Sequence, residues 1–203
     1  MRLIGMLDSP YVRRVAISLT ALDLPFTHES VSVFRHFDAF AAINPVVKAP
    51  TLVTDDGVVL MDSTLIIAHA ERLAAPGMSL EPAGIAAHAR SQRLIGLALA
   101  ACEKTVQIVY EHQLRPEEKR HQPWLDRVQG QLFAAYRALE AEIGEDWLTG
   151  ERPMQADITT AVAFIFTRNM IPEVVPADAF PALARFTARA EALPAFLAMP
   201  YDG

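Results

Sequence analysis

Residues 44–63 constrain the fold of this chain more than any other stretch. Pro45 ends any helix that precedes it, because proline lacks a backbone N–H and restricts the residue before it. Two short apolar runs follow at 51–53 and 58–61, with Asp55-Asp56-Gly57 between them. An Asp-Gly turn between two apolar runs is a strong signal for a β-hairpin. The stretch therefore predicts two antiparallel strands joined by a tight turn.

A proline and a polar pair mark the two ends of this hairpin. Pro50 stands at the head of the first strand, where a proline removes no central hydrogen bond of the sheet. Asp62-Ser63 follows the second strand and precedes an apolar pattern of helical period. Both residues are common at helix starts, and a helix start binds anions through its free N–H groups. The stretch thus offers a free extended backbone to a peptide and a helix start to an anion.

The residues before this stretch predict a strand, a helix, a strand and a less regular segment. Residues 1–7 are apolar and strand-like, whereas residues 26–34 alternate in part, as a strand with one buried face does. Residues 35–43 predict only a short, irregular helix. With the hairpin and the helix after it, the order is β-α-β-α-β-β-α.

The first helix has a clear start. Ser9 is a suitable N-cap, and Pro10 is a favoured first helical residue. Arg13 and Arg14 fall outside the apolar stripe that follows at helical spacing, so the pattern predicts them to be off the buried face. That stripe consists of Val12, Val15, Ala16, Leu19 and Leu22.

A break in composition at 74–82, rich in small residues, proline and glycine, divides the chain. We place a linker at 77–83, between one domain of residues 1–76 and another of residues 84–203. Beyond the break the apolar period is helical throughout. The expected helices are 84–112, a helix that follows the charged turn at 115–120 and carries Trp124 to Ile143 on one side, 154–170, 180–192 and 194–199.

Composition excludes several classes of protein. Hydrophobic residues make up 52% of 203 positions, yet no run is long and pure enough to span a membrane. The chain opens as a strand rather than a secretory signal, and the single Cys102 excludes a disulfide framework and a multi-cysteine zinc site. The six histidines lack the spacing of a helical zinc motif. A net charge of −6 disfavours nucleic-acid and anionic-membrane binders. We therefore expect a cytoplasmic protein with no metal, no nucleic-acid partner and no membrane partner.

Three motifs, in this order, resemble those of a known family. They are Ser-Pro-Tyr-Val-Arg-Arg-Val at 9–15, Asn-Pro-Val-Val-Lys-Ala-Pro-Thr-Leu at 44–52 and Asp-Ser at 62–63, followed by an all-helical second half. Together they resemble the bacterial soluble glutathione transferases with a serine-type active site, over essentially the whole chain. The resemblance implies an α/β thioredoxin-like N-terminal domain plus an all-α C-terminal domain. It also implies a homodimer that uses glutathione as co-substrate.

The resemblance assigns five residues of the hairpin region to glutathione. Pro50 would follow a cis peptide bond, and the backbone of Ala49 would pair with the cysteinyl part. Asp62 and Ser63 would hold the γ-glutamyl end, and Lys48 would contact the glycyl carboxylate. From the residues alone, Lys48 is also consistent with an ordinary solvated lysine, and Asp62-Ser63 with a helix cap.

Ser9, Pro10 and Tyr11 are the other residues expected to bind glutathione, and Ser9 is the candidate for the chemistry. Its hydroxyl can cap the helix and still donate its own proton to a thiolate, although a cap alone also explains it. Tyr11 cannot occupy the same spot, because helical residues two apart face different sides. We interpret Tyr11 as a wall of the electrophile pocket, with a surface aromatic or the thiolate donor as alternatives. Phe34, Tyr110 and His112 are the other residues expected in that pocket.

The expected function is conjugation of the glutathione thiolate to a small hydrophobic electrophile. One alternative is a binding or assembly module that has lost catalysis, against which the presence of Ser9, Lys48, Asp62 and Ser63 argues. Another is a glutathione-dependent isomerase or reductase, which would share the first site and differ only in the pocket. Apolar pockets discriminate weakly, so the residues do not name the electrophile.

Overall fold

A computed structural model describes residues 1–176 and 178–202. The chain divides into two compact units. The N-terminal unit comprises Met1–Leu80 and the C-terminal segment that begins at Ala192, and the helical unit comprises Glu81–Glu191. The sequence-based division assigned the C-terminal segment to the helical domain, whereas in the structure it packs with the N-terminal unit.

The N-terminal unit is built on a small mixed sheet with strand order β2-β1-β3-β4. The strands are β1 (Arg2–Ile4), β2 (Thr27–Glu29), β3 (Thr51–Val53) and β4 (Val59–Met61). β1 is parallel to β2 and antiparallel to β3, and β3 is antiparallel to β4. The predicted hairpin is thus confirmed, with Gly57 in its turn at φ 85°, a conformation that glycine adopts without steric cost.

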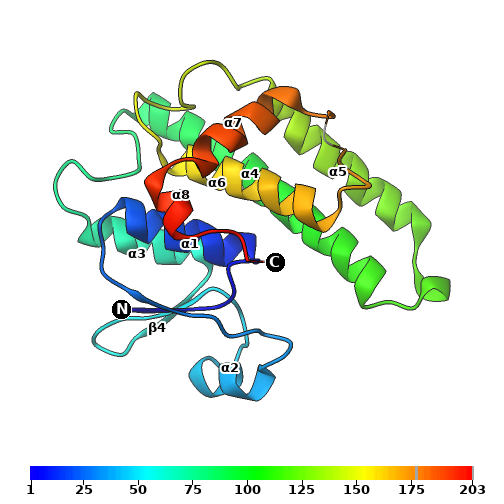
Figure 1. The fold of residues 1–203 in the computed structure, drawn as a ribbon, viewed down its shortest axis with the longest axis horizontal. Coiled ribbons are helices and arrows are strands. Elements are labelled where there is room, and N and C mark those ends of the chain that lie inside the picture. The colour runs from blue at the N-terminus through cyan, green and yellow to red at the C-terminus, as the bar shows by residue number, and fades with distance from the viewer. Residues whose placement is uncertain (177, 203) are drawn as a thin grey trace. The chain divides into compact units, whose positions relative to one another are not determined.

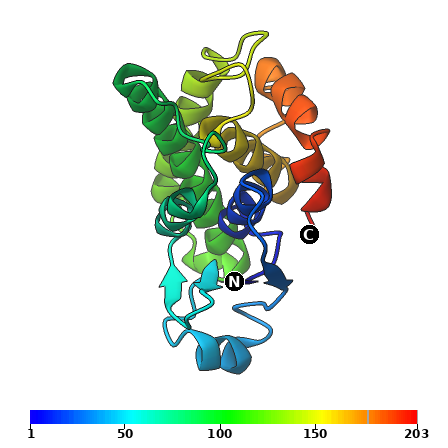
Figure 2. The ribbon, with the colours of Figure 1, turned by 90° about the vertical axis from the view of Figure 1, so that its left-hand side faces the viewer.

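Three helices flank this sheet: α1 (Pro10–Ala21), α2 (Phe37–Ile43) and α3 (Ser63–Leu73). α1 and α3 cover one face and α2 lies on the other, as Figures 1 and 2 show. The predicted order β-α-β-α-β-β-α is confirmed. Apolar residues of β1, α1, β3 and α3 form the core around the sheet. They are Leu3, Ile4, Val12, Val15, Ala16, Leu19, Leu52, Ile66, Ile67 and Ala70, all 5% exposed or less.

The helical unit contains α4 (Ile85–Gln113), the short 3-10 helix η1 (Glu117–Lys119), α5 (Gln122–Glu140), α6 (Gln155–Met170) and α7 (Pro181–Glu191). α4 packs against both α5 and α6, and α7 packs against α6 (Figure 1). The last helix, α8 (Pro194–Ala198), packs against α1 in the N-terminal unit.

A buried chain of hydroxyl groups joins the central helices of the helical unit. Tyr136 donates to Ala163 O at 3.0 Å and lies 2.5 Å from Thr167 Oγ1, which is 2.7 Å from Thr105 Oγ1. Burial raises the pKa of the Tyr136 hydroxyl well above its usual value, so it stays protonated and keeps its donor. Cys102, predicted to be a small core residue, is buried beside this chain.

Two strands are shorter than predicted. β1 spans residues 2–4 rather than 1–7, and β2 spans residues 27–29 rather than 26–34. The second strand ends early because the Ser32 hydroxyl accepts the N–H groups of Phe34 and Arg35 at 3.2 and 3.1 Å. A hydroxyl that accepts hydrogen bonds from nearby N–H groups stabilises a local turn, which competes with the hydrogen bonds of a strand.

Predictions for two helices were wrong in part. Arg13 and Arg14 are 1% and 2% exposed, although the helical period placed them off the buried face, because α1 is covered by α3 on one side and α8 on another. α5 ends at Glu140 rather than near Ile143, and Trp124 in its first turn is 41% exposed.

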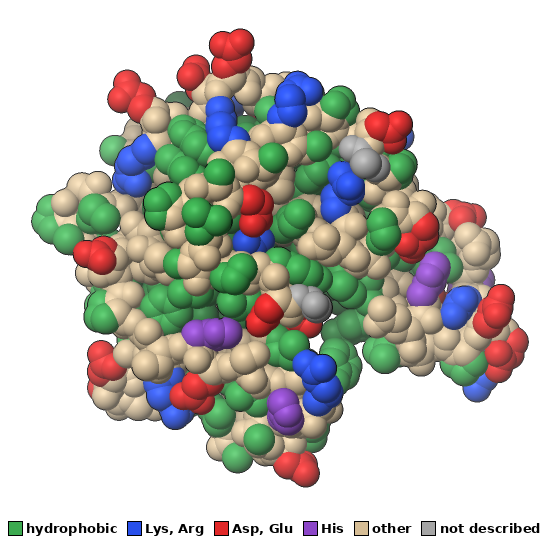
Figure 3. Space-filling model, in the orientation of Figure 1, with side chains coloured by type: hydrophobic (Ala, Val, Ile, Leu, Met, Phe, Trp, Pro, Cys, Tyr) green, Lys and Arg blue, Asp and Glu red, His purple; other side chains and the backbone are tan. Residues whose placement is uncertain are grey.

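Charged side chains of both signs are interspersed over the face that Figure 3 shows. None of the helices among residues 1–176 and 178–202 has the length and apolar character needed to cross a membrane.

Candidate functional site

The predicted glutathione residues converge on one edge of the sheet. Ile4, Thr51 and Met61 lie side by side in the register of β1, β3 and β4. Pro50 precedes the middle residue of this row and Asp62 follows the last. Residues adjacent to one row of a sheet lie at the same edge, so the hairpin brings Pro50 and Asp62 to one place.

Gly5 connects this edge to the start of α1, and the sequence-based reasoning missed it. A Cβ on Gly5 would lie 2.6 Å from a methyl group of Val12 and 3.2 Å from the Ala49 Cβ. Its φ of 138° also lies where L-residues are strained. The backbone segments that carry Ala49 and the first turn of α1 therefore approach as closely as they do because residue 5 has no side chain. The signal in the sequence was a glycine directly after a strand.

Ser9 is the N-cap of α1, as predicted. Its backbone is extended at φ −73° and ψ 124°, and its Oγ accepts the Val12 N–H at 3.5 Å. That distance is long for a hydrogen bond, so the cap holds the hydroxyl only weakly. Pro10 is buried at the first helical position, where its missing N–H costs nothing. Burial, followed by the charge of Asp202, raises the pKa of the neighbouring Asp8 carboxyl.

The Ala49-Pro50 peptide bond is cis, which confirms the prediction. The loop before it is held by polar contacts at Thr51, whose hydroxyl donates to Lys48 O at 2.8 Å and accepts from Asn44 Nδ2 at 2.8 Å. Val47 has φ 51°, which is a rare conformation for a β-branched residue. Such strain tends to collect at functional sites, where the surrounding structure enforces it.

Asp62 is the N-cap of α3, and its φ of 72° is a second strained conformation. Its Oδ1 accepts the N–H groups of Thr64 and Leu65 at 2.9 and 3.4 Å, so the predicted helix cap is present. Its Oδ2 lies 4.0 Å from Lys48 Nζ. Both side chains are about half exposed, at 55% and 47%, so solvent screens this ion pair and it adds little stability. The contact nevertheless brings Lys48 and Asp62 into one cluster. Lys48 is predicted to bind the glycyl end of glutathione, and Asp62 the γ-glutamyl end.

Ser63 is buried beneath this cluster, at 4% exposure. Its Oγ accepts a hydrogen bond of 2.9 Å from Arg14 Nη1, which also donates to Thr64 Oγ1 at 3.2 Å. Sequence-based reasoning missed Arg14 as a partner of Ser63, because the contact joins residues 49 positions apart.

Two family models match the chain. The N-terminal domain of glutathione S-transferase matches residues 3–78, and the C-terminal domain of the same family matches residues 122–189. The chain belongs to the glutathione S-transferase family.

Individual members of this family support the assignment over nearly the full length. The maleylacetoacetate isomerase of Pseudomonas aeruginosa is 28% identical over 200 residues, covering 93% of this chain and 89% of that protein. A glutathione S-transferase of Methylobacterium radiotolerans, solved in complex with glutathione sulfonate, is 28% identical with a TM-score of 0.91, covering 100% and 95%. A family member from Pseudomonas fluorescens with bound glutathione is 28% identical with a TM-score of 0.86, covering 100% and 99%.

The four residues predicted for the electrophile pocket of this transferase family member lie in different units. Tyr11, in the first turn of α1, is partly exposed, and Phe34 is 62% exposed in the turn after β2. Tyr110, 44% exposed, and His112 lie in the last turn of α4 in the helical unit. The pocket remains a prediction.

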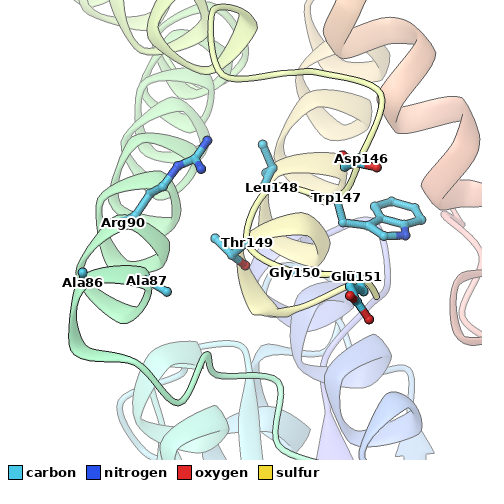
Figure 4. Close-up of a pocket in the computed structure, with 9 residues that line it drawn as sticks. All are labelled: Ala86, Ala87, Arg90, Asp146, Trp147, Leu148, Thr149, Gly150 and Glu151. Carbon is cyan, nitrogen blue, oxygen red and sulfur yellow. The ribbon is translucent and has the colours of Figure 1, made fainter.

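A cavity of about 770 Å³ lies within the helical unit (Figure 4). It is bounded by the first turns of α4 and by the loop at 146–151, and the Trp147 ring points away from Arg90. Arg189 stacks on that ring at 3.9 Å and donates to Asp146 O at 2.9 Å, which fixes the loop. Tyr110 and His112 lie at the opposite end of α4, so this cavity is not the predicted electrophile pocket.

Metal-ligand chemistry is not assembled in the part of the chain that the structure describes. No group of three or more His, Cys, Asp or Glu side chains there is suited to hold an ion.

Proposed function

We propose that this protein binds glutathione at the sheet edge described above and transfers its thiolate to a small hydrophobic electrophile. The observation that carries the proposal is the convergence of Pro50, Lys48 and Asp62 on one edge of the sheet. Gly5, which has no side chain, lets the segment that carries Ala49 approach the start of α1. A peptide with a carboxylate at each end and an amine at one end matches this mixture of groups. Related proteins of the family were solved with glutathione sulfonate and with glutathione bound.

In this proposal each part of glutathione has its own partner. Asp62 faces the α-amine of the γ-glutamyl end, Ser63 faces the α-carboxylate, and Lys48 faces the glycyl carboxylate. The backbone of Ala49 pairs with the cysteinyl peptide group. The thiol then lies at the start of α1, where Ser9 donates a hydrogen bond to the thiolate.

The chemistry requires no nucleophile from the protein. A free thiol titrates at about 8.5, so a minority is thiolate at neutral pH, and the thiolate is the reactive form. A hydroxyl donor and the positive end of a helix both favour the charged form. The sulfur then forms a bond to an electrophilic carbon, and the leaving group departs with its electron pair.

Isomerisation is the second candidate function, because a relative of 28% identity is a maleylacetoacetate isomerase. The same thiolate would add to a double bond and be expelled after rotation, so glutathione would be regenerated. Only the pocket for the second substrate distinguishes this activity from conjugation.

The family also leads us to expect a homodimer of this 22.3 kDa chain. Four apolar side chains of the N-terminal unit support this assembly, since exposed apolar surface of this kind marks interaction sites. They are Val46, Val59, Met61 and Leu65, exposed by 60%, 44%, 38% and 66%. We call these four residues the β4–α3 patch. Val46 and Met61 flank Asn44, to which both are hydrogen-bonded.

The test of the proposed function is calorimetric titration with glutathione, followed by a substrate panel. The panel contains an aryl halide, an epoxide, an organic peroxide and a cis-configured unsaturated diketo acid. We expect micromolar to millimolar binding of glutathione and turnover of the aryl halide or epoxide with loss of free thiol. Turnover of the unsaturated acid without thiol loss would establish the isomerase instead. A protein that binds no glutathione would refute both.

A further inference from the structure

Arg14 joins α1 to the start of α3 from inside the protein. The residue is 2% exposed, and its Nη1 donates to Ser63 Oγ at 2.9 Å and to Thr64 Oγ1 at 3.2 Å. A buried charge is costly unless it is hydrogen-bonded, so its position behind Ser63 is enforced by these contacts. Its planar guanidinium contacts two consecutive residues of the turn at once.

The hydrogen bond from Arg14 fixes the direction of the Ser63 hydroxyl. A guanidinium has donors only, so Ser63 Oγ must be the acceptor in this contact. A hydroxyl carries one proton, which is then available to donate to another group. With Arg14 below it, Ser63 therefore functions as a donor toward whatever binds at the start of α3.

The charges around Ser63 favour a zwitterion. Asp62 Oδ1 is occupied by the N–H groups of Thr64 and Leu65, while its Oδ2 faces Lys48. Arg14 adds a permanent positive charge behind the same turn. The dipole of α3 adds partial positive charge at the start of that helix. An amine fits beside Asp62, and a carboxylate fits above Ser63, with the buried Arg14 guanidinium behind it.

On this basis we infer that Arg14 is a positioning residue that directs the Ser63 hydroxyl at the α-carboxylate of the γ-glutamyl group and supplies positive charge behind it. The inference rests on the proposed function, since it names how the glutathione site selects its ligand. Arg14 does not touch the ligand and acts through Ser63.

The test compares three ligands by titration calorimetry. They are glutathione, 4-aminobutyryl-cysteinylglycine, which lacks only the α-carboxylate, and glutaryl-cysteinylglycine, which lacks only the α-amine. We expect Arg14→Met to raise the Kd of the two ligands that keep the α-carboxylate at least tenfold and to leave the Kd of the aminobutyryl ligand within twofold. Ser63→Ala should give the same selective loss, and the double variant should be no weaker than the weaker single variant.

Arg13→Met is the matched control for removing a buried arginine from α1. Arg13 bonds to Met199 O at 2.9 Å and lies over the Phe196 ring, so its loss should lower the melting temperature without changing ligand selectivity. If Arg14→Met does not fold, Arg14→Lys is the variant that tests the inference. Lysine keeps the positive charge and loses the planar guanidinium that contacts the hydroxyls of Ser63 and Thr64. This variant should weaken binding of the two ligands that keep the α-carboxylate two- to tenfold and leave binding of the third unchanged.

A folded Arg14 variant that binds all three ligands as the wild type does, or loses all three equally, overturns the inference. Wild-type protein that binds none of the three contradicts the proposed function itself, whereas binding without carboxylate selectivity contradicts only the role of Arg14.

Discussion

Asp157 shows how much a single buried carboxylate organises. It is 1% exposed, and its two oxygens accept the N–H groups of Leu148 and Met154 at 2.8 and 2.9 Å. One side chain thus fixes the loop before α6 and the start of that helix. Burial raises the pKa of this carboxyl above its usual value of 3.8, against the opposing effect of the two N–H donors.

We expect Asp157→Asn to lower the free energy of unfolding by about 1–3 kcal/mol at pH 7, because an amide presents a donor to one of two backbone N–H groups. Urea denaturation measures this loss. Asp126→Asn is the control. Asp126 is exposed on the surface of α5, where its Oδ1 accepts from Gln122 Nε2 at 2.7 Å, so this change should alter stability by less than about 0.5 kcal/mol.

The pH dependence of this loss follows from the raised pKa. The folded chain binds the Asp157 proton more tightly than the unfolded chain, so this group's contribution to stability falls as pH rises from 3.8 through the raised value. The asparagine variant lacks this titration. Its deficit relative to the wild type should therefore grow as the pH is lowered toward 3.8, and a deficit that shrinks would contradict the assignment.

At the scale of elements, local chemistry predicted most of what proved correct. The hairpin turn at Gly57, the helix start at Ser9-Pro10 and the cap at Asp62 each depend on neighbouring residues only. The early end of β2 depends on a hydroxyl that competes with the strand ladder. The burial of Arg13 and Arg14 depends on α8 and α3, which pack on α1 from distant parts of the sequence. Helical period alone does not contain that information.

The β4–α3 patch gives a prediction about assembly at the same scale. We expect light scattering at micromolar concentration to show a dimer for the wild type and a monomer for Leu65→Glu, because a buried carboxylate would have no partner there. Leu197→Glu on α8 is a matched control, since Leu65 and Leu197 are both 66% exposed. A wild-type monomer would refute the dimer, and a Leu65→Glu dimer would place the interface elsewhere.

At the scale of the whole molecule, the N-terminal unit contains residues from both ends of the chain. The segment from Ala192 onward returns to α1, where Met199 O accepts from Arg13 and the Phe196 ring lies beneath the same guanidinium. The helix that presents Ser9 is therefore braced by residues nearly two hundred positions away. The order of motifs along the sequence predicted the family and the fold, and it contained no signal for this bracing contact.

In the proposed function, Ser9 stabilises the thiolate of bound glutathione. One hydrogen bond to a charged group contributes about 1.5–3 kcal/mol, which lowers a pKa by roughly one to two units. The dipole of α1 adds about 0.3–1 kcal/mol, so the hydroxyl is the larger effect. Ser9→Ala removes the hydroxyl and the cap, whereas Ser9→Gly removes the hydroxyl and weakens the cap by only a few tenths of a kcal/mol.

The most direct measurement is the ultraviolet absorbance of the bound thiolate, titrated with pH under saturating glutathione. We expect the wild-type complex to titrate roughly one to two units below the value of about 8.5 for a free thiol, and both Ser9 variants to titrate near that value. Superimposable titrations of the wild type and Ser9→Gly would show that Ser9 only caps α1, and would contradict the account.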